Sequence, residues 1–229
     1  MKTYLEFIQE NYKVKILTND DWSEVDEVTD ELMYSLLDLT KLPELPKSLR
    51  ILRCHSNRLT KLPKLPEKLE HLDCSSNRLT SLPELPSNIK VIECYDNKLT
   101  ELPKLPESLG DLDCADNQLT TLPELPESLY RLYCINNQLN WLPKLPEDLK
   151  ELICYNNPLQ CLIPERFYKD QNIDWMRKYL KEIQTYKFQK NLLDKDPNQI
   201  HELLKRNIIH QKIKEEYPDL TSSTEWGLI

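Results

Sequence analysis

A block of twenty residues recurs six times between residues 39 and 160 without insertion or deletion, and this period limits what the chain can fold into. Each copy follows the pattern LPxLPxxLxxLxCxxNxL, with Ile89 and Ile92 replacing leucine in one copy. A unit this short cannot bury an apolar side on its own, so the copies must stack on one another. The sequence therefore predicts a solenoid over residues 39–160 in which each copy is one coil.

The second half of each copy predicts a short strand. Around Ile92, Glu93 and Cys94 the side chains alternate between apolar and polar, as in a strand with one buried face. One strand per coil builds a parallel sheet, and we expect its outward residues to line a concave face. The asparagine that follows each strand is expected to satisfy backbone groups of the adjacent coil with its amide. The LPxLP segment predicts a polyproline II back.

This pattern resembles the leucine-rich repeat, whose general form is LxxLxLxxN/CxL, with cysteine in the third apolar position. The LPxLP segment is similar to the twenty-residue repeats of the YopM and IpaH bacterial effector families, and related repeats occur in amoeba-associated microbes and large viruses. The resemblance covers residues 39–160. It implies an α/β leucine-rich-repeat fold and a protein that binds host proteins inside host cells. Some relatives are ubiquitin ligases with a catalytic cysteine after the repeats, but no cysteine follows Cys161 here, which argues against that activity.

Six cysteines recur at the same position of the copies: Cys54, Cys74, Cys94, Cys114, Cys134 and Cys154. Neighbouring thiols in a parallel stack lie about 4.8 Å apart, whereas a disulfide needs Cβ atoms about 3.8 Å apart and a twist. Close pairs of the C-x2-C kind, which are typical of metal sites, are absent. We expect buried free thiols that pack as small hydrophobes, with soft-metal or redox use as the alternative. Cys161 is out of phase and is expected to be more reactive.

The segments that flank the repeats predict helices. Residues 1–38 are expected to form an N-terminal helical cap, with apolar residues at helical spacing near the start and a second helix over residues 21–37. Residues 161–229 are expected to form a C-terminal helical cap or extension, since two amphipathic stretches follow Pro164. The predicted fold class is an α/β leucine-rich-repeat solenoid with helical flanks at both ends.

Composition excludes several classes of function. The formal net charge is −8 and no basic stripe is present, which argues against nucleic acid. No apolar run approaches the roughly 18 residues of a membrane helix, and the first residues do not form a secretory signal. We expect a cytoplasmic protein, and the resemblance implies the host-cell cytosol. No catalytic pair or phosphate-binding loop stands outside positions that the solenoid explains, so we expect no enzyme activity, cofactor or metal. Besides the soft-metal alternative for the cysteines, a metal site near His55, His71 and Asp73 is a further alternative.

The outward strand positions vary while the scaffold repeats, and this contrast identifies the candidate binding face. The middle copies are acidic and the last two carry tyrosine and isoleucine, which suits a basic or amphipathic protein partner. The predicted partner-binding residues are Asp73, Glu93, Tyr95, Asp96, Asp111, Asp113, Asp116, Tyr133, Ile135, Ile153 and Tyr155. Two alternatives stay open: a solvated face without a partner, and a scaffold whose C-terminal helical region carries the interaction.

Charges also alternate along the back of the predicted coils. The variable residue of LPxLP is, in order, Glu44, Lys64, Glu84, Lys104, Glu124 and Lys144. Stacked coils would bring opposite charges next to one another, and a coil out of order would bring like charges together. The alternation therefore predicts ion pairs that favour the correct register, each worth about 0–1 kcal/mol.

Overall fold

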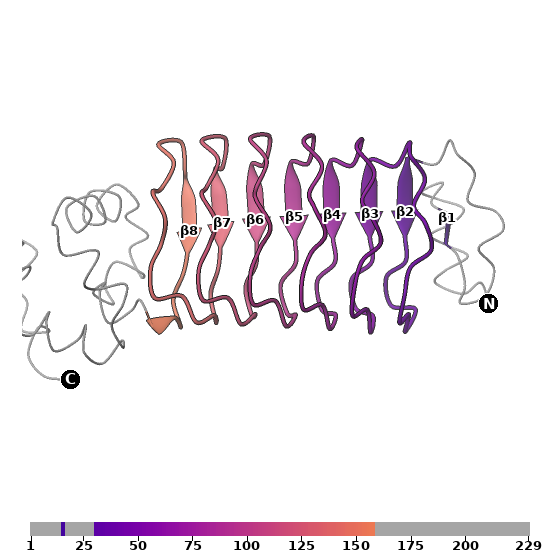
Figure 1. The fold of residues 1–229 in the computed structure, drawn as a ribbon, viewed down its shortest axis with the longest axis horizontal. Coiled ribbons are helices and arrows are strands. Elements are labelled where there is room, and N and C mark those ends of the chain that lie inside the picture. The colour runs from indigo at the N-terminus through magenta and orange to yellow at the C-terminus, as the bar shows by residue number, and fades with distance from the viewer. Residues whose placement is uncertain (1–14, 17–29, 159–229) are drawn as a thin grey trace, which may run out of the picture. The chain divides into compact units, whose positions relative to one another are not determined.

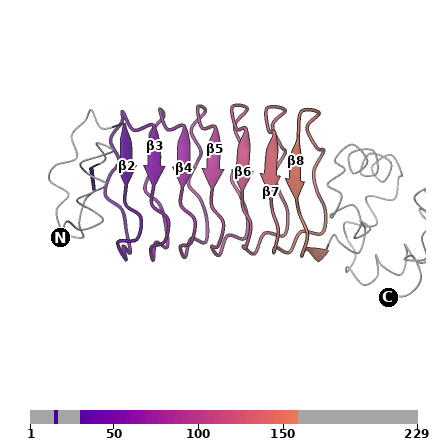
Figure 2. The same ribbon diagram turned by 180° about the vertical axis from the view of Figure 1, so that it is seen from behind.

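The computed structural model describes residues 15–16 and 30–158, and a single parallel sheet runs through this part of the chain (Figure 1). Its strands follow chain order, and from β2 onward one coil separates each strand from the next, as the view from behind also shows (Figure 2). The strands are β1 (Lys15–Ile16), β2 (Glu31–Met33), β3 (Ile51–Arg53), β4 (His71–Asp73), β5 (Val91–Glu93), β6 (Asp111–Asp113), β7 (Arg131–Tyr133) and β8 (Glu151–Ile153). From β2 onward each strand residue pairs with the residue twenty positions later, such as Leu72 with Ile92. The predicted parallel solenoid is confirmed.

The core is a set of apolar columns that run through the stack. In a middle coil Leu109, Leu112, Cys114 and Leu119 are all fully buried, and the equivalent residues of the other coils are buried with them. In most strands a buried middle residue separates two half-buried ones, so the predicted alternation is confirmed. Each coil encloses only part of this core, which is why its stability depends on the neighbouring coils.

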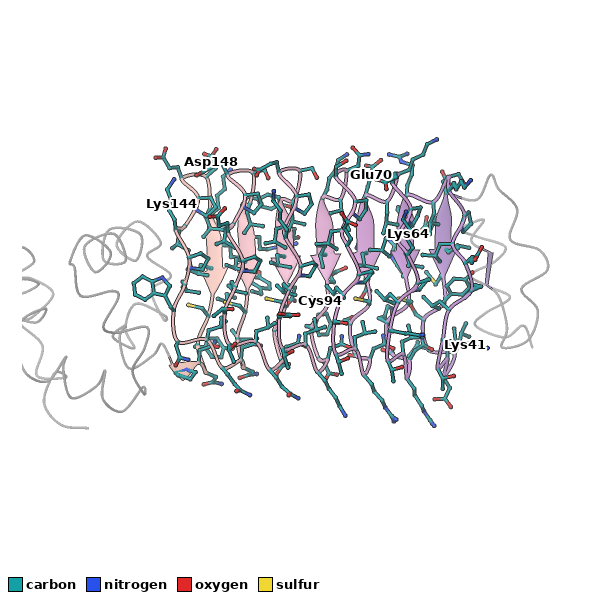
Figure 3. All side chains as sticks on the ribbon, in the orientation of Figure 1. Lys41, Lys64, Glu70, Cys94, Lys144 and Asp148 are labelled. Carbon is teal, nitrogen blue, oxygen red and sulfur yellow. The ribbon has the colours of Figure 1, made fainter. Side chains whose placement is uncertain are left out.

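The six cysteines form one of these columns. All six thiols are free and fully buried, and Figure 3 shows Cys94 inside the solenoid. Burial in apolar surroundings disfavours the thiolate and raises the pKa of Cys74, Cys94 and Cys134 well above its usual value. The packing role predicted for these residues is confirmed. Cys161 lies outside the described residues.

The asparagines that recur every twenty residues link each coil to the one before it through hydrogen bonds. The Oδ1 atom of Asn117 accepts a hydrogen bond from the backbone N–H of Leu99 at 3.0 Å. Its Nδ2 atom donates to the carbonyls of Cys94 in the preceding coil and of Cys114 and Ala115 in its own coil, at 2.9–3.2 Å. Asn57, Asn77, Asn97, Asn137 and Asn157 repeat the contact that links the coils. The bridging role predicted for the amide is confirmed.

Two tight turns close each coil. The residue before each asparagine has a positive φ, a backbone region that Asp and Asn tolerate better than most residues. These residues are Ser56, Ser76, Asp96, Asp116, Asn136 and Asn156. On the back, the carbonyl of the second proline accepts a hydrogen bond from the residue three positions on, as from Leu109 to Pro106 at 3.1 Å. The LPxLP segment is neither helix nor strand, and its polyproline II geometry stays a prediction.

The first coil begins earlier than the sequence indicated. Glu31–Met33 is strand β2 and pairs with β3, so the prediction of a helix up to Leu37 and of a cap ending at residue 38 is wrong for this segment. Residues 31–40 are a divergent copy in which Tyr34 takes the cysteine position and is fully buried. Leu36 occupies the positive-φ position with a φ of 63° and is 68% exposed. The same apolar residues fit helical spacing, which is what misled the prediction.

The remaining flank predictions lie outside the described residues. They concern the helices expected in residues 1–14 and 17–29 and in residues 159–229. The chain divides into two units, Met1–Asn157 and Pro158–Ile229. The boundary predicted at residue 160 is close to this division of the chain, and the helical character of both flanks stays a prediction.

The charge alternation on the back does not produce the expected ion pairs. All six side chains are exposed, and Figure 3 labels two of them, Lys64 and Lys144. Within residues 30–158 only Lys144 of the six forms an ion pair, with Glu127 at 2.8 Å rather than with Glu124. A different set of ion pairs joins three successive coils, at the residue just before each strand. Glu70 accepts hydrogen bonds from Arg50 at 2.6 Å and from Lys90 at 2.7 Å. These two cations lower the pKa of Glu70 to about 2.

Candidate interaction surface on the outer face of the sheet

The outward side chains of β3 to β8, together with the residue that follows each cysteine, make up what we call the sheet face. The register places Asp73, Glu93 and Asp113 in adjacent positions of neighbouring strands. Adjacent strands are about 4.8 Å apart, so three carboxylates stand in a row at the spacing of the sheet. Tyr133 and Ile153 continue the same row on β7 and β8.

The first two carboxylates of the row have partners on the sheet face. The Oε2 atom of Glu93 lies 2.9 Å from the Nε2 atom of His71, and this hydrogen bond lowers the pKa of Glu93. Asp73 accepts hydrogen bonds from the hydroxyl and the backbone N–H of Ser75, at 2.7 and 3.2 Å. Its other oxygen lies 4.0 Å from the Nε2 atom of His55. Both side chains are therefore held in one orientation.

The polar groups of β6 to β8 form a second set of contacts. Asp111, which is 4% exposed, accepts hydrogen bonds from two nitrogens of the Arg131 guanidinium. The guanidinium carbon of Arg131 lies 5.6 Å from the ring centre of Tyr133, a cation–π contact. The hydroxyl of Tyr133 in turn donates to Glu151 at 2.5 Å, and this bond raises the pKa of the tyrosine. The polar groups of Asp111 and Tyr133 thus already form hydrogen bonds within the solenoid.

Asp113 differs from the other carboxylates of the sheet face. Its hydrogen bond comes from the backbone N–H of Ala115, two residues along its own chain, at 3.1 Å. Within residues 30–158 no cation pairs with it. Burial raises the pKa of Asp113, and the negative charges of Glu93, Asp111 and Asp116 raise it further. The centre of the sheet face therefore carries a partly desolvated negative charge that is not paired with a cation of the described residues.

The apolar members of the predicted site surround this centre unevenly. Tyr95 and Tyr155 are 37% and 40% exposed, and both follow a cysteine at the end of a strand. Ile135 and Ile153 are half-buried. These four residues give the sheet face apolar area on both sides of Asp113 along the stack. Aromatic side chains such as the two tyrosines contribute a large contact area in protein interfaces.

Asp96 and Asp116 lie in the positive-φ turns beyond the strands rather than on them. Asp116 accepts a hydrogen bond from Asn136 at 2.6 Å, and Asn136 accepts one from Asn156 at 2.7 Å. Both aspartates are exposed at the edge of the sheet face, and the charge of Asp116 adds to the negative field around Asp113. Their conformation gives them a structural reason to be present that the sequence prediction did not consider.

Sequence reasoning missed the residues that hold the acidic row in place. The sequence did not identify His71, Arg131 and Glu151 as the partners of Glu93, Asp111 and Tyr133. One signal was present: each pair joins residues 18 to 22 positions apart, the separation of laterally adjacent side chains in a twenty-residue coil. Scanning for opposite charges at that separation would have found the first two pairs.

Metal-binding and reactive side chains are the next feature to consider in the described part of the chain. No group of three or more His, Cys, Asp and Glu side chains in it is placed to hold a metal ion. The thiols are buried, and burial raises the pKa even of the least enclosed one, Cys154, to about 12. No helix among the described residues has the length and apolar character needed to cross a membrane. The feature that remains as a candidate site is the sheet face, with its pattern of charged and apolar side chains.

Comparison with known proteins agrees with the stacked twenty-residue coils. A family profile described as Leucine Rich Repeat matches residues 68–89, which span one coil. Residues 31–157 form a leucine-rich-repeat domain. No similar curated protein sequence was found.

Solved structures extend the likeness to effector proteins. YopM, a leucine-rich effector protein from Yersinia pestis, is 42% identical over 57% of this chain and 38% of its own, with a TM-score of 0.56. YopM from Yersinia enterocolitica is 35% identical over 58% of this chain and 34% of its own, with a TM-score of 0.51. A Shigella effector leucine-rich-repeat domain is 38% identical over 51% of this chain and 54% of its own, with a TM-score of 0.50. The leucine-rich-repeat domain described here therefore resembles those of effectors, and this chain spans little more than a third of either YopM chain.

Proposed function

We propose that the leucine-rich-repeat domain is a non-enzymatic module that binds a partner protein on the sheet face. The partner would place a lysine or arginine side chain against Asp113 and apolar side chains against Tyr95 and Tyr155. The observation that carries the proposal is that the charge of Asp113 has no cation partner among the described residues. Burial and three neighbouring carboxylates raise the pKa of Asp113. A perturbed carboxylate of this kind marks a candidate functional position.

The surroundings of Asp113 support binding rather than a fault in packing. Glu93 and Asp111 each have a side-chain partner from another strand, since His71 forms a hydrogen bond with Glu93 and Arg131 an ion pair with Asp111. A face whose side chains are already ordered loses less conformational entropy on association. The remaining charge is then available to a cation from outside, and the partly desolvated position would strengthen that contact.

We further propose that the domain acts in the cytoplasm, and in the host cytosol if the likeness to Yersinia and Shigella effectors extends to location. The six cysteines of the repeats are all free, which suits a reducing compartment. An interaction carried by residues 159–229 is the competing outcome of the experiment below, and the ligase-like alternative has no support among the described residues.

The experiment compares capture of proteins by three forms of the full chain. The first is the wild type, the second carries Glu93→Lys and Asp113→Lys, and the third carries Glu84→Lys and Glu124→Lys on the exposed back. The proposal predicts proteins that the first and third forms capture and the second does not, with equal cooperative unfolding of all three forms by circular dichroism. Equal capture by the second form would refute the site. If deletion of residues 164–229 then abolished capture, the interaction would belong to that region.

A further inference from the structure

Two histidines of the sheet face stand next to carboxylates of the following coil. His71 on β4 contacts Glu93 on β5, with Nε2 and Oε2 2.9 Å apart. His55, which follows β3, lies across from Asp73 on β4, with Nε2 and Oδ2 4.0 Å apart. Both imidazoles are half-buried, so each is ordered and still open to protons from solvent. Histidine is the side chain whose charge ordinarily changes between about pH 5 and 8.

The charges around the two pairs come from the neighbouring strands. On the N-terminal side Arg53 of β3 is paired with Glu31 of β2. On the C-terminal side Asp113 of β6 stands next to Glu93, and Arg131 of β7 also acts on the Glu93 carboxylate. Asp73 of β4 lies between these groups. His55 and His71 are therefore the two imidazoles of this part of the face, and each stands beside a carboxylate of the next coil.

We propose that protonation of His71 and His55 switches off the acidic row, so that the sheet face binds a cationic partner at neutral pH and releases it at mildly acidic pH. A neutral His71 donates one hydrogen bond to Glu93 and leaves its negative charge in place. When the ring takes up a proton from solvent, it becomes an imidazolium and neutralises that charge. The same step at His55 neutralises Asp73. This inference rests on the proposed function and adds its regulation.

Of the row of three carboxylates, only Asp113 would then stand without a neighbouring positive charge. A lysine or arginine of the partner would meet one unpaired carboxylate instead of three. Charged pairs at an interface act mainly on the rate of association and on specificity. We therefore expect affinity for a cationic peptide to fall about tenfold between about pH 7.5 and 5.5 at constant ionic strength, which is a change of about 1.4 kcal/mol.

The test measures binding of a fluorescein-labelled lysine-rich peptide to the full chain by fluorescence anisotropy at the two pH values. The variants are His71→Gln and the double variant His55→Gln/His71→Gln, in which an amide keeps hydrogen bonding without gaining charge. The inference predicts the tenfold fall in the wild type and a fall of less than about threefold in the double variant, because glutamine at positions 55 and 71 gains no charge as the pH falls. A peptide with glutamine in place of lysine serves as the control for charge.

Equal pH dependence of the wild type and the double variant would overturn the switch and leave the proposed function standing. Absence of binding at neutral pH would overturn the proposed function, and the switch with it. A second measurement needs no partner. Carbon-13 NMR of the glutamate carboxyls should show the pKa of Glu93 lowered in the wild type and returned toward its ordinary value in His71→Leu, which has no donor, because the hydrogen bond to His71 is the main cause of the shift. An unchanged pKa of Glu93 would show that the pair is not coupled.

Discussion

Replacement of Asn117 by alanine should destabilise the domain more than its small size suggests. The amide is buried and makes four hydrogen bonds, one from the Leu99 N–H and three to the carbonyls of Cys94, Cys114 and Ala115. Alanine leaves the N–H of Leu99 without this partner, which costs about 1–3 kcal/mol for a buried group. Loss of the bonds to the carbonyls adds about 1 kcal/mol or more.

The expected total is about 2–4 kcal/mol, against the roughly 5–15 kcal/mol of stability that a folded domain usually has. Urea unfolding followed by circular dichroism measures it, with Gln118→Ala as the control because Gln118 is exposed and adjacent. The control should stay within about 0.5 kcal/mol of the wild type. Asn117→Asp keeps the acceptor for Leu99 but turns a charge toward three carbonyls, so it should not restore stability. A loss below about 1 kcal/mol in Asn117→Ala would refute the bridging role.

Three further predictions concern the charges and thiols. Because the pKa of Asp113 is raised in the folded protein, its ionised form disfavours folding, so Asp113→Asn should stabilise the domain at neutral pH, with a gain that disappears as the pH falls below the unfolded-state value of about 3.9. Urea unfolding against pH checks this, and equal stability at pH 7 would contradict it. The pKa of Glu70 should be about 2 by carboxyl NMR and should rise in Arg50→Gln/Lys90→Gln; no rise would exclude the ion pairs as its cause. Thiol reagents should label Cys94 only after unfolding, and rapid labelling of the native protein would contradict its packing role.

Most of the fold could be predicted because the repeat has a fixed period. A leucine, cysteine or asparagine at the same place in six copies has the same neighbours in each, so one physical argument covers them all. Residues 31–40 escaped because Tyr34 and Leu37 replace the two most diagnostic residues, cysteine and asparagine. The fold tolerates this because Tyr34 fills the core at that point and Asn57 of the next coil still bonds to its carbonyl at 2.6 Å.

The candidate site was predictable as a surface but not as a set of contacts. The alternation of inward and outward residues placed Glu93, Asp111 and Asp113 on one face, as the register shows. Which of them finds a cation depends on side-chain length and orientation, since the long guanidinium of Arg131 reaches Asp111 whereas Tyr133, directly beside Asp113, offers no charge. The same limit explains the back, where Lys144 reaches Glu127 instead of Glu124.

The most direct test of the central claim, that a partner binds the sheet face, is site-specific photo-crosslinking. A benzophenone side chain replaces Tyr95, which is exposed beside Glu93 on the sheet face, or Lys104, which is exposed on the back. The full chain is irradiated with its captured partner, and the crosslinked yield is compared between the two positions. Our account predicts a crosslink from position 95 and little or none from position 104. A crosslink from position 104 alone would contradict it.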